Sequence, residues 1–95
     1  MGAAAPSLYA VECDMSWTER DGALHREITT PDFMTAFRIA AALVGPAETA
    51  GHHPDVAFGW GYVRIALTTH DGGGVTEKDV TLAAQIDAAL RPFGV

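Results

Sequence analysis

The chain has 95 residues, of which 48% are apolar and 19% charged, and its formal net charge is −6. This balance is typical of one small globular domain and excludes an intrinsically disordered chain, while a core of this size is marginal and favours association into an oligomer. The six Lys and Arg residues are scattered and form no basic stripe that could neutralise phosphates, so we expect no direct nucleic-acid binding.

The amino-terminal residues are predicted to form a tail in front of a single domain. Residues 1–7 offer little to bury, which indicates a flexible tail, and the domain is expected to cover 8–95. The apolar-leaning stretch 8–13 fits a short helix or a strand equally well.

A β-hairpin is predicted over residues 16–30. Asp21-Gly22 is a strong signal for a two-residue turn, because both residue types tolerate positive φ. After the turn, Leu24 and Ile28 alternate with polar residues as in a half-buried strand, and only Arg26 interrupts this pattern.

A helix is predicted to follow the hairpin. Thr30 offers an N-cap hydroxyl, and Pro31 and Asp32 suit the first turn. An apolar stripe at helical spacing is expected to face the core. Its members are Phe33, Phe37, Ala40 and Val44. Gly45-Pro46 should stop or kink the helix, because proline lacks the donor N–H and collides with the preceding turn.

Two strands and a second helix are predicted in the rest of the chain. Residues 55–69 alternate like strands, with a turn at Gly59-Trp60-Gly61. Thr76 and Asp79 form a capping box that opens the last helix. The buried stripe of that helix is predicted to be Val80, Ala83, Ile86 and Leu90.

The resulting order, β-β-α-β-β-α with room for a short helix in front, predicts an α+β fold in which the helices pack on one face of a four-stranded antiparallel sheet. Cys13 is the only cysteine, so neither an internal disulfide nor a CxxC motif can form. The longest apolar run, 39–44, is far too short to span a bilayer, and the first residues lack the positive charge of a signal peptide. We therefore expect a cytoplasmic protein that does not bind membranes.

Three of the four histidines occupy positions that suit a binding site. His52 and His53 follow the first long helix, and Pro54 holds His53 towards extended geometry. His70 ends a strand, on its polar side, in front of a glycine loop. Imidazole has an unperturbed pKa of about 6.5, so two positioned histidines can serve as acid and base near neutral pH.

The spacing of these residues resembles the signature of the pterin-4a-carbinolamine dehydratases, a family also known as dimerisation cofactors of a homeodomain transcription factor. The matching residues are Glu48, His52-His53-Pro54, Trp60, His70 and Asp79. The resemblance extends from about Trp17 to Leu90. Three features depart from it: Val56 stands where relatives often carry tryptophan, Pro46 stands where they usually continue a helix, and the amino-terminal helix is short or absent.

The resemblance implies a catalytic set of His52, His53 and His70, in which His53 also holds the pterin. Residues implied to contact the substrate are His53, Pro54, Thr69, Asp71 and Gly72. Glu48 and Asp79 are implied as supporting residues, although the capping box by itself explains Asp79 and a surface position explains Glu48. Which histidine is the acid and which the base stays open; we favour His70 at the departing hydroxyl.

The implied activity is removal of water from 4a-hydroxytetrahydropterin to give quinonoid dihydropterin, in tetrahydrobiopterin recycling beside an aromatic amino acid hydroxylase. The pterin is the substrate and no cofactor is implied; the family also implies a homodimer or homotetramer. Three histidines and a carboxylate could bind zinc, but no HxH or HExxH spacing occurs, so we expect no metal. The alternative is a non-catalytic scaffold or coactivator-like binding module on the same fold. The intact histidine set favours the enzyme.

Overall fold

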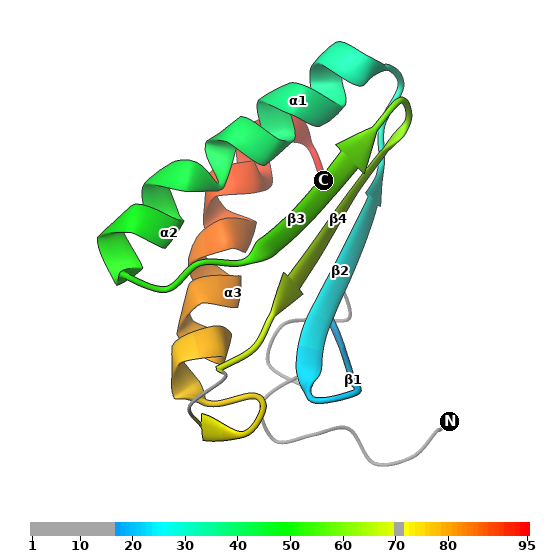
Figure 1. Ribbon diagram of the computed structural model, residues 1–95. Helices are drawn as coiled ribbons and strands as arrows, with labels where there is room; N and C mark the ends of the chain where they lie inside the picture. The colour runs from blue at the N-terminus through cyan, green and yellow to red at the C-terminus, as the bar shows by residue number, and fades with distance from the viewer. Residues whose placement is uncertain (1–16, 70–71) are drawn as a thin grey trace.

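The computed structural model describes residues 17–69 and 72–95, which form one antiparallel sheet covered on one face by helices (Figure 1). The strands are β1 (Thr18–Arg20), β2 (Ala23–Thr29), β3 (Asp55–Gly59) and β4 (Tyr62–Leu67), in the order β1-β2-β4-β3. The helices are α1 (Phe33–Ala42), α2 (Val44–Ala50) and α3 (Glu77–Leu90), followed by the short 3-10 helix η3 (Arg91–Phe93). The predicted α+β fold is therefore confirmed. The expected tail, 1–7, and the stretch 8–13 lie outside the described residues.

The first hairpin closes at the turn that the sequence indicates. Asp21 and Gly22 both have positive φ, 54° and 77°, which gives a two-residue turn whose twist matches that of the flanking strands. The second predicted turn also forms, since β3 ends at Gly59 and β4 begins at Tyr62. Both hairpins confirm the predicted strand pairs.

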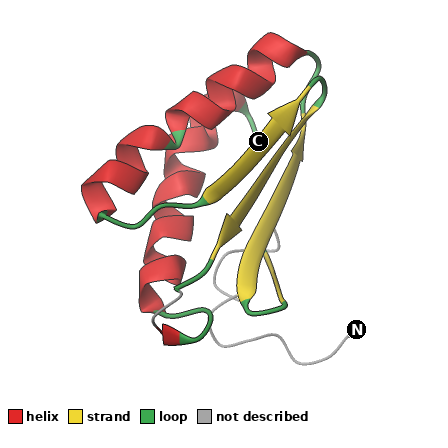
Figure 2. Ribbon diagram, viewed as in Figure 1, coloured by secondary structure: helices red, strands yellow, loops and turns green. Residues whose placement is uncertain are grey.

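The core lies between the sheet and the helices (Figure 2). Its strand residues are those that the alternation predicts, including Leu24, Ile28, Val63, Ile65 and Leu67. From α3 the buried residues include Leu82, Ala83, Ile86 and Leu90. The predicted stripe of α3 is thus confirmed, with Val80 packed at its partly buried margin.

Arg26, which interrupts the strand pattern in the sequence, points into the helix-covered side of the sheet. Its Nη1 donates to Asp87 Oδ1 of α3 at 2.6 Å, and Trp17 Nε1 donates to the same oxygen at 2.9 Å. The side chain of Arg26 is 9% exposed. An ion pair across the layers therefore explains how a charged residue occupies a core-facing position.

The predicted core face of the first helix is wrong. Phe33, Phe37 and Val44 are 53%, 50% and 59% exposed, and the buried residues are instead Ala36, Ile39 and Leu43. Both sets recur at helical spacing, so periodicity alone could not choose between them. The two exposed rings pack against Phe58 of β3, with centroids 5.6 and 6.1 Å apart, at the edge of the core.

The same helix begins later than predicted and breaks where predicted. Its N-cap is Asp32 rather than Thr30; the hydrogen bonds from Thr35, including a 2.7 Å bond from its N–H, hold the pKa of Asp32 below its ordinary value. The helix is interrupted at Leu43, and Pro46 lies in the first turn of α2, where no intrahelical acceptor requires its N–H. The predicted kink is confirmed.

The Arg26–Asp87 ion pair, at 2.6 Å, and the exposed Arg64–Glu27 pair, at 2.7 Å, provide a test of this packing. Asp87→Ala leaves the Arg26 guanidinium without its carboxylate, so the free energy of unfolding should fall by roughly 3 kcal/mol. Glu27→Ala, which removes the exposed partner of Arg64, should cost less than about 1 kcal/mol. Urea denaturation at neutral pH measures both, and equal losses would contradict the assignment of Arg26–Asp87 as an interior contact.

Candidate active site

Several of the predicted site residues that the structure describes lie where the end of α2 and the start of α3 meet. Gly51 ends α2 with φ of 64°, a left-handed conformation that glycine adopts without strain, and its N–H donates to the Glu48 carbonyl. The chain then turns through His52, His53 and Pro54 into β3. This turn places the two histidines beside different partners.

His52 points towards α3, where it meets a buried carboxylate. Its Nε2 lies 2.6 Å from Asp79 Oδ1, and Asp79 is fully buried. An ionised carboxylate only accepts hydrogen bonds, so Nε2 donates and Nδ1 is the nitrogen left to exchange a proton. The ring is therefore held in a fixed orientation by a partner that solvent does not reach.

The second oxygen of Asp79 completes the network. Its Oδ2 accepts the Thr76 backbone N–H at 2.9 Å and the Thr69 hydroxyl at 2.7 Å. Asp79 thus closes the predicted capping box and holds His52 at the same time. The two interpretations that the sequence left as alternatives are compatible, because each uses a different oxygen.

His53 turns the other way. Its Nε2 lies 2.7 Å from Glu48 Oε2, and both side chains are largely exposed. The predicted supporting residue Glu48 therefore contacts a predicted site residue, from one turn earlier on α2. Both members of this pair are therefore accessible to solvent.

The strand end reaches the site through Thr69. Its N–H donates to the Gly74 carbonyl, and Gly72 N–H donates to the Thr69 carbonyl, so both donors are used within the loop. A Cβ on Gly72 would lie 2.7 Å from Thr76 Cγ2, which favours glycine there. His70 and Asp71 lie outside the described residues. Their implied roles, and the substrate contacts of Thr69, Gly72 and Pro54, stay predictions.

A cavity of about 370 Å³ adjoins His52. It is lined by Ala50, His52 and a face of α3 that includes Lys78, Thr81 and Gln85. This volume suits a small organic ligand. The sequence analysis missed the α3 lining, although residues 78, 81, 82 and 85 share one helical face and are recognisable by that spacing.

One signature residue and one position that departs from the family pattern do not line this cavity. Trp60 is 72% exposed in the turn between β3 and β4, at the opposite end of β3 from the histidines. Val56, the departure from the family pattern, is exposed on β3.

In the described part of the chain, no three His, Cys, Asp or Glu residues are grouped so that they could hold a metal ion. Within those same ranges, no helix is long and apolar enough to cross a membrane.

A family model described as pterin 4 alpha carbinolamine dehydratase matches residues 5–89. The chain belongs to this family. A relative from Paracoccus denitrificans, named provisionally as a pterin-4-alpha-carbinolamine dehydratase, is 47% identical over 67% of this chain and 60% of its own length, which is less than two thirds. One from Thermosynechococcus vestitus, named in the same way, is 44% identical over 74% of each chain.

Solved structures agree with this family. The crystal structure of a transcriptional coactivator/pterin dehydratase from Brucella melitensis is 33% identical, covers 84% of this chain and 87% of its own, and superposes with a TM-score of 0.75. A pterin dehydratase-like protein, a RuBisCO assembly factor in the alpha-carboxysome, is 26% identical over 81% of this chain and 92% of its own, with a TM-score of 0.66. The resemblance inferred from the signature is thereby confirmed.

The network around Asp79 can be tested by comparing two carboxylates that contact neighbouring histidines. Asp79→Ala leaves Thr76 N–H, the Thr69 hydroxyl and His52 Nε2 without an acceptor, so stability should fall by about 2–4 kcal/mol. Glu48→Ala removes the exposed partner of His53 and should cost less than about 1 kcal/mol. Urea denaturation measures both losses. Comparable losses would show that Asp79 does not hold the site together.

Proposed function

We propose that this protein is a 4a-hydroxytetrahydropterin dehydratase, which removes water to give quinonoid dihydropterin by histidine acid–base catalysis and needs no cofactor. The observation that carries the proposal is the 2.6 Å contact between His52 Nε2 and the buried carboxylate of Asp79. Membership of the dehydratase family supports it, as do the names of the relatives.

The reaction needs one base and one acid. A base removes a proton from a ring nitrogen of the substrate, an acid delivers a proton to the departing hydroxyl, and water leaves without any change of oxidation state. His52 suits one of these roles, because Asp79 orients its ring and stabilises the imidazolium that forms when Nδ1 takes up a proton. His70 is proposed for the other role, at the hydroxyl.

The remaining predicted residues are proposed to bind the pterin. His53, held by Glu48 at the rim of the site, would contact the ring beside Pro54. The segment from Thr69 to Gly72, which includes Asp71, would lie along the ring edge. Thr69 has a further part, because its hydroxyl bonds the carboxylate that orients His52.

The decisive experiment is an assay of chemically made 4a-hydroxytetrahydropterin with variants of His52 and His70. His52→Gln keeps an N–H donor for Asp79 but cannot exchange a proton, so it should retain the fold and lose about a hundredfold to ten-thousandfold in rate. His52→Ala and His70→Ala should lose comparable activity. Stopped-flow absorbance follows the dehydration.

Trp60→Ala is the matched control, because Trp60 belongs to the same signature but lies in the exposed β3–β4 turn. This variant should keep the wild-type rate, and circular dichroism establishes that every variant is folded. Equal rates in the wild type and all the histidine variants would exclude the dehydratase mechanism.

A scaffold is the second candidate, and one feature favours it. The rings of Phe33, Phe37 and Phe58 form an exposed aromatic cluster on α1 and β3, and clustered exposed apolar surface marks protein contacts. The similar RuBisCO assembly factor is a precedent for a protein of this fold that assists the assembly of another protein. The test is a variant in which the three phenylalanines are replaced and the histidines are kept. Loss of the protein's function in vivo in this variant would favour the scaffold.

We also propose that the protein acts as a homodimer or homotetramer in the cytoplasm, beside an aromatic amino acid hydroxylase that supplies the hydroxylated pterin. Two features support self-association. A core this small gains stability from further burial in an oligomer. The exposed aromatic cluster is apolar surface that a second copy would cover.

A further inference from the structure

The amino terminus of α3 carries a hydroxyl group, that of Thr76, which the proposed reaction leaves without a role. Thr76 is the N-cap of α3, and its Oγ1 accepts the Lys78 N–H at 3.3 Å. Capping uses this oxygen only as an acceptor, so the hydroxyl proton is still available to a second partner. Thr69 Oγ1 lies 2.8 Å from Thr76 Oγ1 and supplies that partner.

The number of protons fixes the direction of the bond between the two hydroxyls. The Thr69 hydroxyl has one proton and donates it to Asp79 Oδ2 at 2.7 Å, since an ionised carboxylate can only accept. Thr69 Oγ1 is therefore the acceptor in its contact with Thr76, and Thr76 is the donor. Thr76 and Thr69 thus form a hydroxyl chain in which every donor points towards the Asp79 carboxylate.

The carboxylate connects this hydroxyl chain with His52. Asp79 Oδ1 lies 2.6 Å from His52 Nε2, while Oδ2 accepts from the Thr69 hydroxyl and from the Thr76 N–H. Both oxygens belong to one planar group, so the donors to Oδ2 fix the rotation that aims Oδ1 at the imidazole. Because Asp79 is fully buried, solvent does not reach the carboxylate to replace a donor that is lost.

Thr69 is itself held by its backbone, so its hydroxyl is a fixed support. Its N–H donates to the Gly74 carbonyl at 2.9 Å. Its carbonyl accepts the N–H groups of Gly72 and Gly74 at 3.0 and 3.2 Å. These bonds close the loop between β4 and α3, so the middle member of the hydroxyl chain does not depend on Thr76 for its backbone position.

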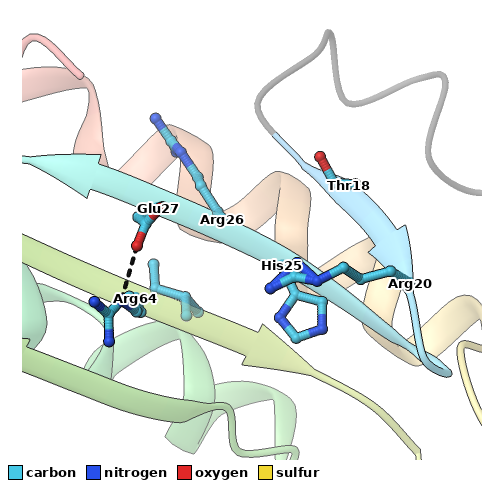
Figure 3. A pocket seen from close by; sticks show the side chains of 7 residues that line it. Thr18, Arg20, His25, Arg26, Glu27 and Arg64 are labelled. Atoms are coloured by element: carbon cyan, nitrogen blue, oxygen red, sulfur yellow. Dashed lines mark hydrogen bonds and ion pairs between the residues drawn. The ribbon is translucent and has the colours of Figure 1, made fainter.

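The hydroxyl chain lies on the side of the sheet that the helices cover, because Thr69 contacts α3 there and is only 9% exposed. The opposite face of the sheet carries exposed charged side chains. Among them, Arg64 Nε donates to Glu27 Oε2 at 2.7 Å (Figure 3). This exposed pair offers a hydrogen bond that can be removed as a control without changing the helix-covered side.

We infer that Thr76 is a positioning residue for His52: its hydroxyl, acting through Thr69, holds the Asp79 carboxylate in the rotation that orients the imidazole. A hydroxyl that accepts one hydrogen bond donates a stronger one, so loss of the Thr76 O–H weakens the bond from Thr69 to Asp79 Oδ2. This role rests on the proposed dehydratase function, since His52 is the group that Thr76 positions.

The test measures steady-state kinetics with 4a-hydroxytetrahydropterin and NMR of the His52 ring nitrogens, both on the full chain. Thr76→Gly removes the hydroxyl but keeps a residue type that caps helices well. We expect kcat to fall about tenfold with KM within about twofold, because a misoriented imidazole impairs the chemical step rather than binding. The His52 Nε2–H proton should exchange faster with solvent. Thr76→Ser keeps the donor and should hold kcat within about threefold of wild type.

Thr69→Val removes the middle hydroxyl with little change of side-chain volume. By itself it should lower kcat and speed exchange of the His52 Nε2–H proton, so the hydroxyl chain is tested even if Thr76→Gly does not fold. If Thr76 acts through Thr69, the double variant should lose no more kcat than Thr69→Val alone, because residues that act in series are not additive. Additive losses would overturn the role assigned to Thr76.

Two controls separate positioning from a general loss of stability. Asp32→Gly makes the same N-cap replacement on α1, at the other end of the α1–α2 pair from His52 (Figure 1). Glu27→Ala removes the hydrogen bond on the open face. Neither should change kcat by more than about twofold or alter the His52 resonance, because both sites are exposed and remote from the carboxylate.

Three results would overturn the proposal: equal effects of Asp32→Gly and Thr76→Gly, failure of Thr76→Ser to keep kcat, or an unchanged His52 resonance in Thr76→Gly. A wild type without dehydratase activity would overturn the proposed function instead. The His52 resonance would then still decide whether Thr76 fixes the ring, because it is measured without substrate.

Discussion

The carboxylate of Asp79 connects three segments that are distant along the chain. It is fully buried, and such a group is stable only when its oxygens accept hydrogen bonds. The donors come from the first turn of α3, from the end of β4 through Thr69, and from His52 after α2. The condition that keeps a buried charge satisfied is therefore the same condition that orients the histidine, so the stability of the fold and the geometry of the site are physically linked.

Sequence patterns predicted β2, β4 and α3 because each of these elements has a single apolar face. The prediction failed for α1, where Phe33 and Phe37 lie on one apolar face and Ala36 and Ile39 on another. The larger side chains gave the stronger signal, yet the smaller ones pack against the sheet. The Asp32 N-cap was missed for a related reason, since Thr30 and Asp32 are both good capping residues and only the backbone path chooses between them.

The site could be predicted as a set of residues but not as a set of contacts. The family resemblance implied roles for His52, Thr69 and Asp79 in one site, and the structure joins these three residues by hydrogen bonds. It could not show that Asp79 serves the helix cap and His52 together, because that contact spans 27 positions and depends on how α2 packs near α3. Arg26 illustrates the same limit, since its disruptive position is explained only by Asp87, 61 residues away.

The interruption at Leu43 separates α2 from the longer helix before it, and this has a mechanical consequence for the two histidines. His52 is anchored across to α3, whereas His53 is paired with Glu48, which α2 carries. A small rotation of α2 about the break would move the His53 imidazole, while the contact with Asp79 would keep the His52 imidazole in place. Movement at the break would therefore alter the surface position of His53 more than the interior position of His52.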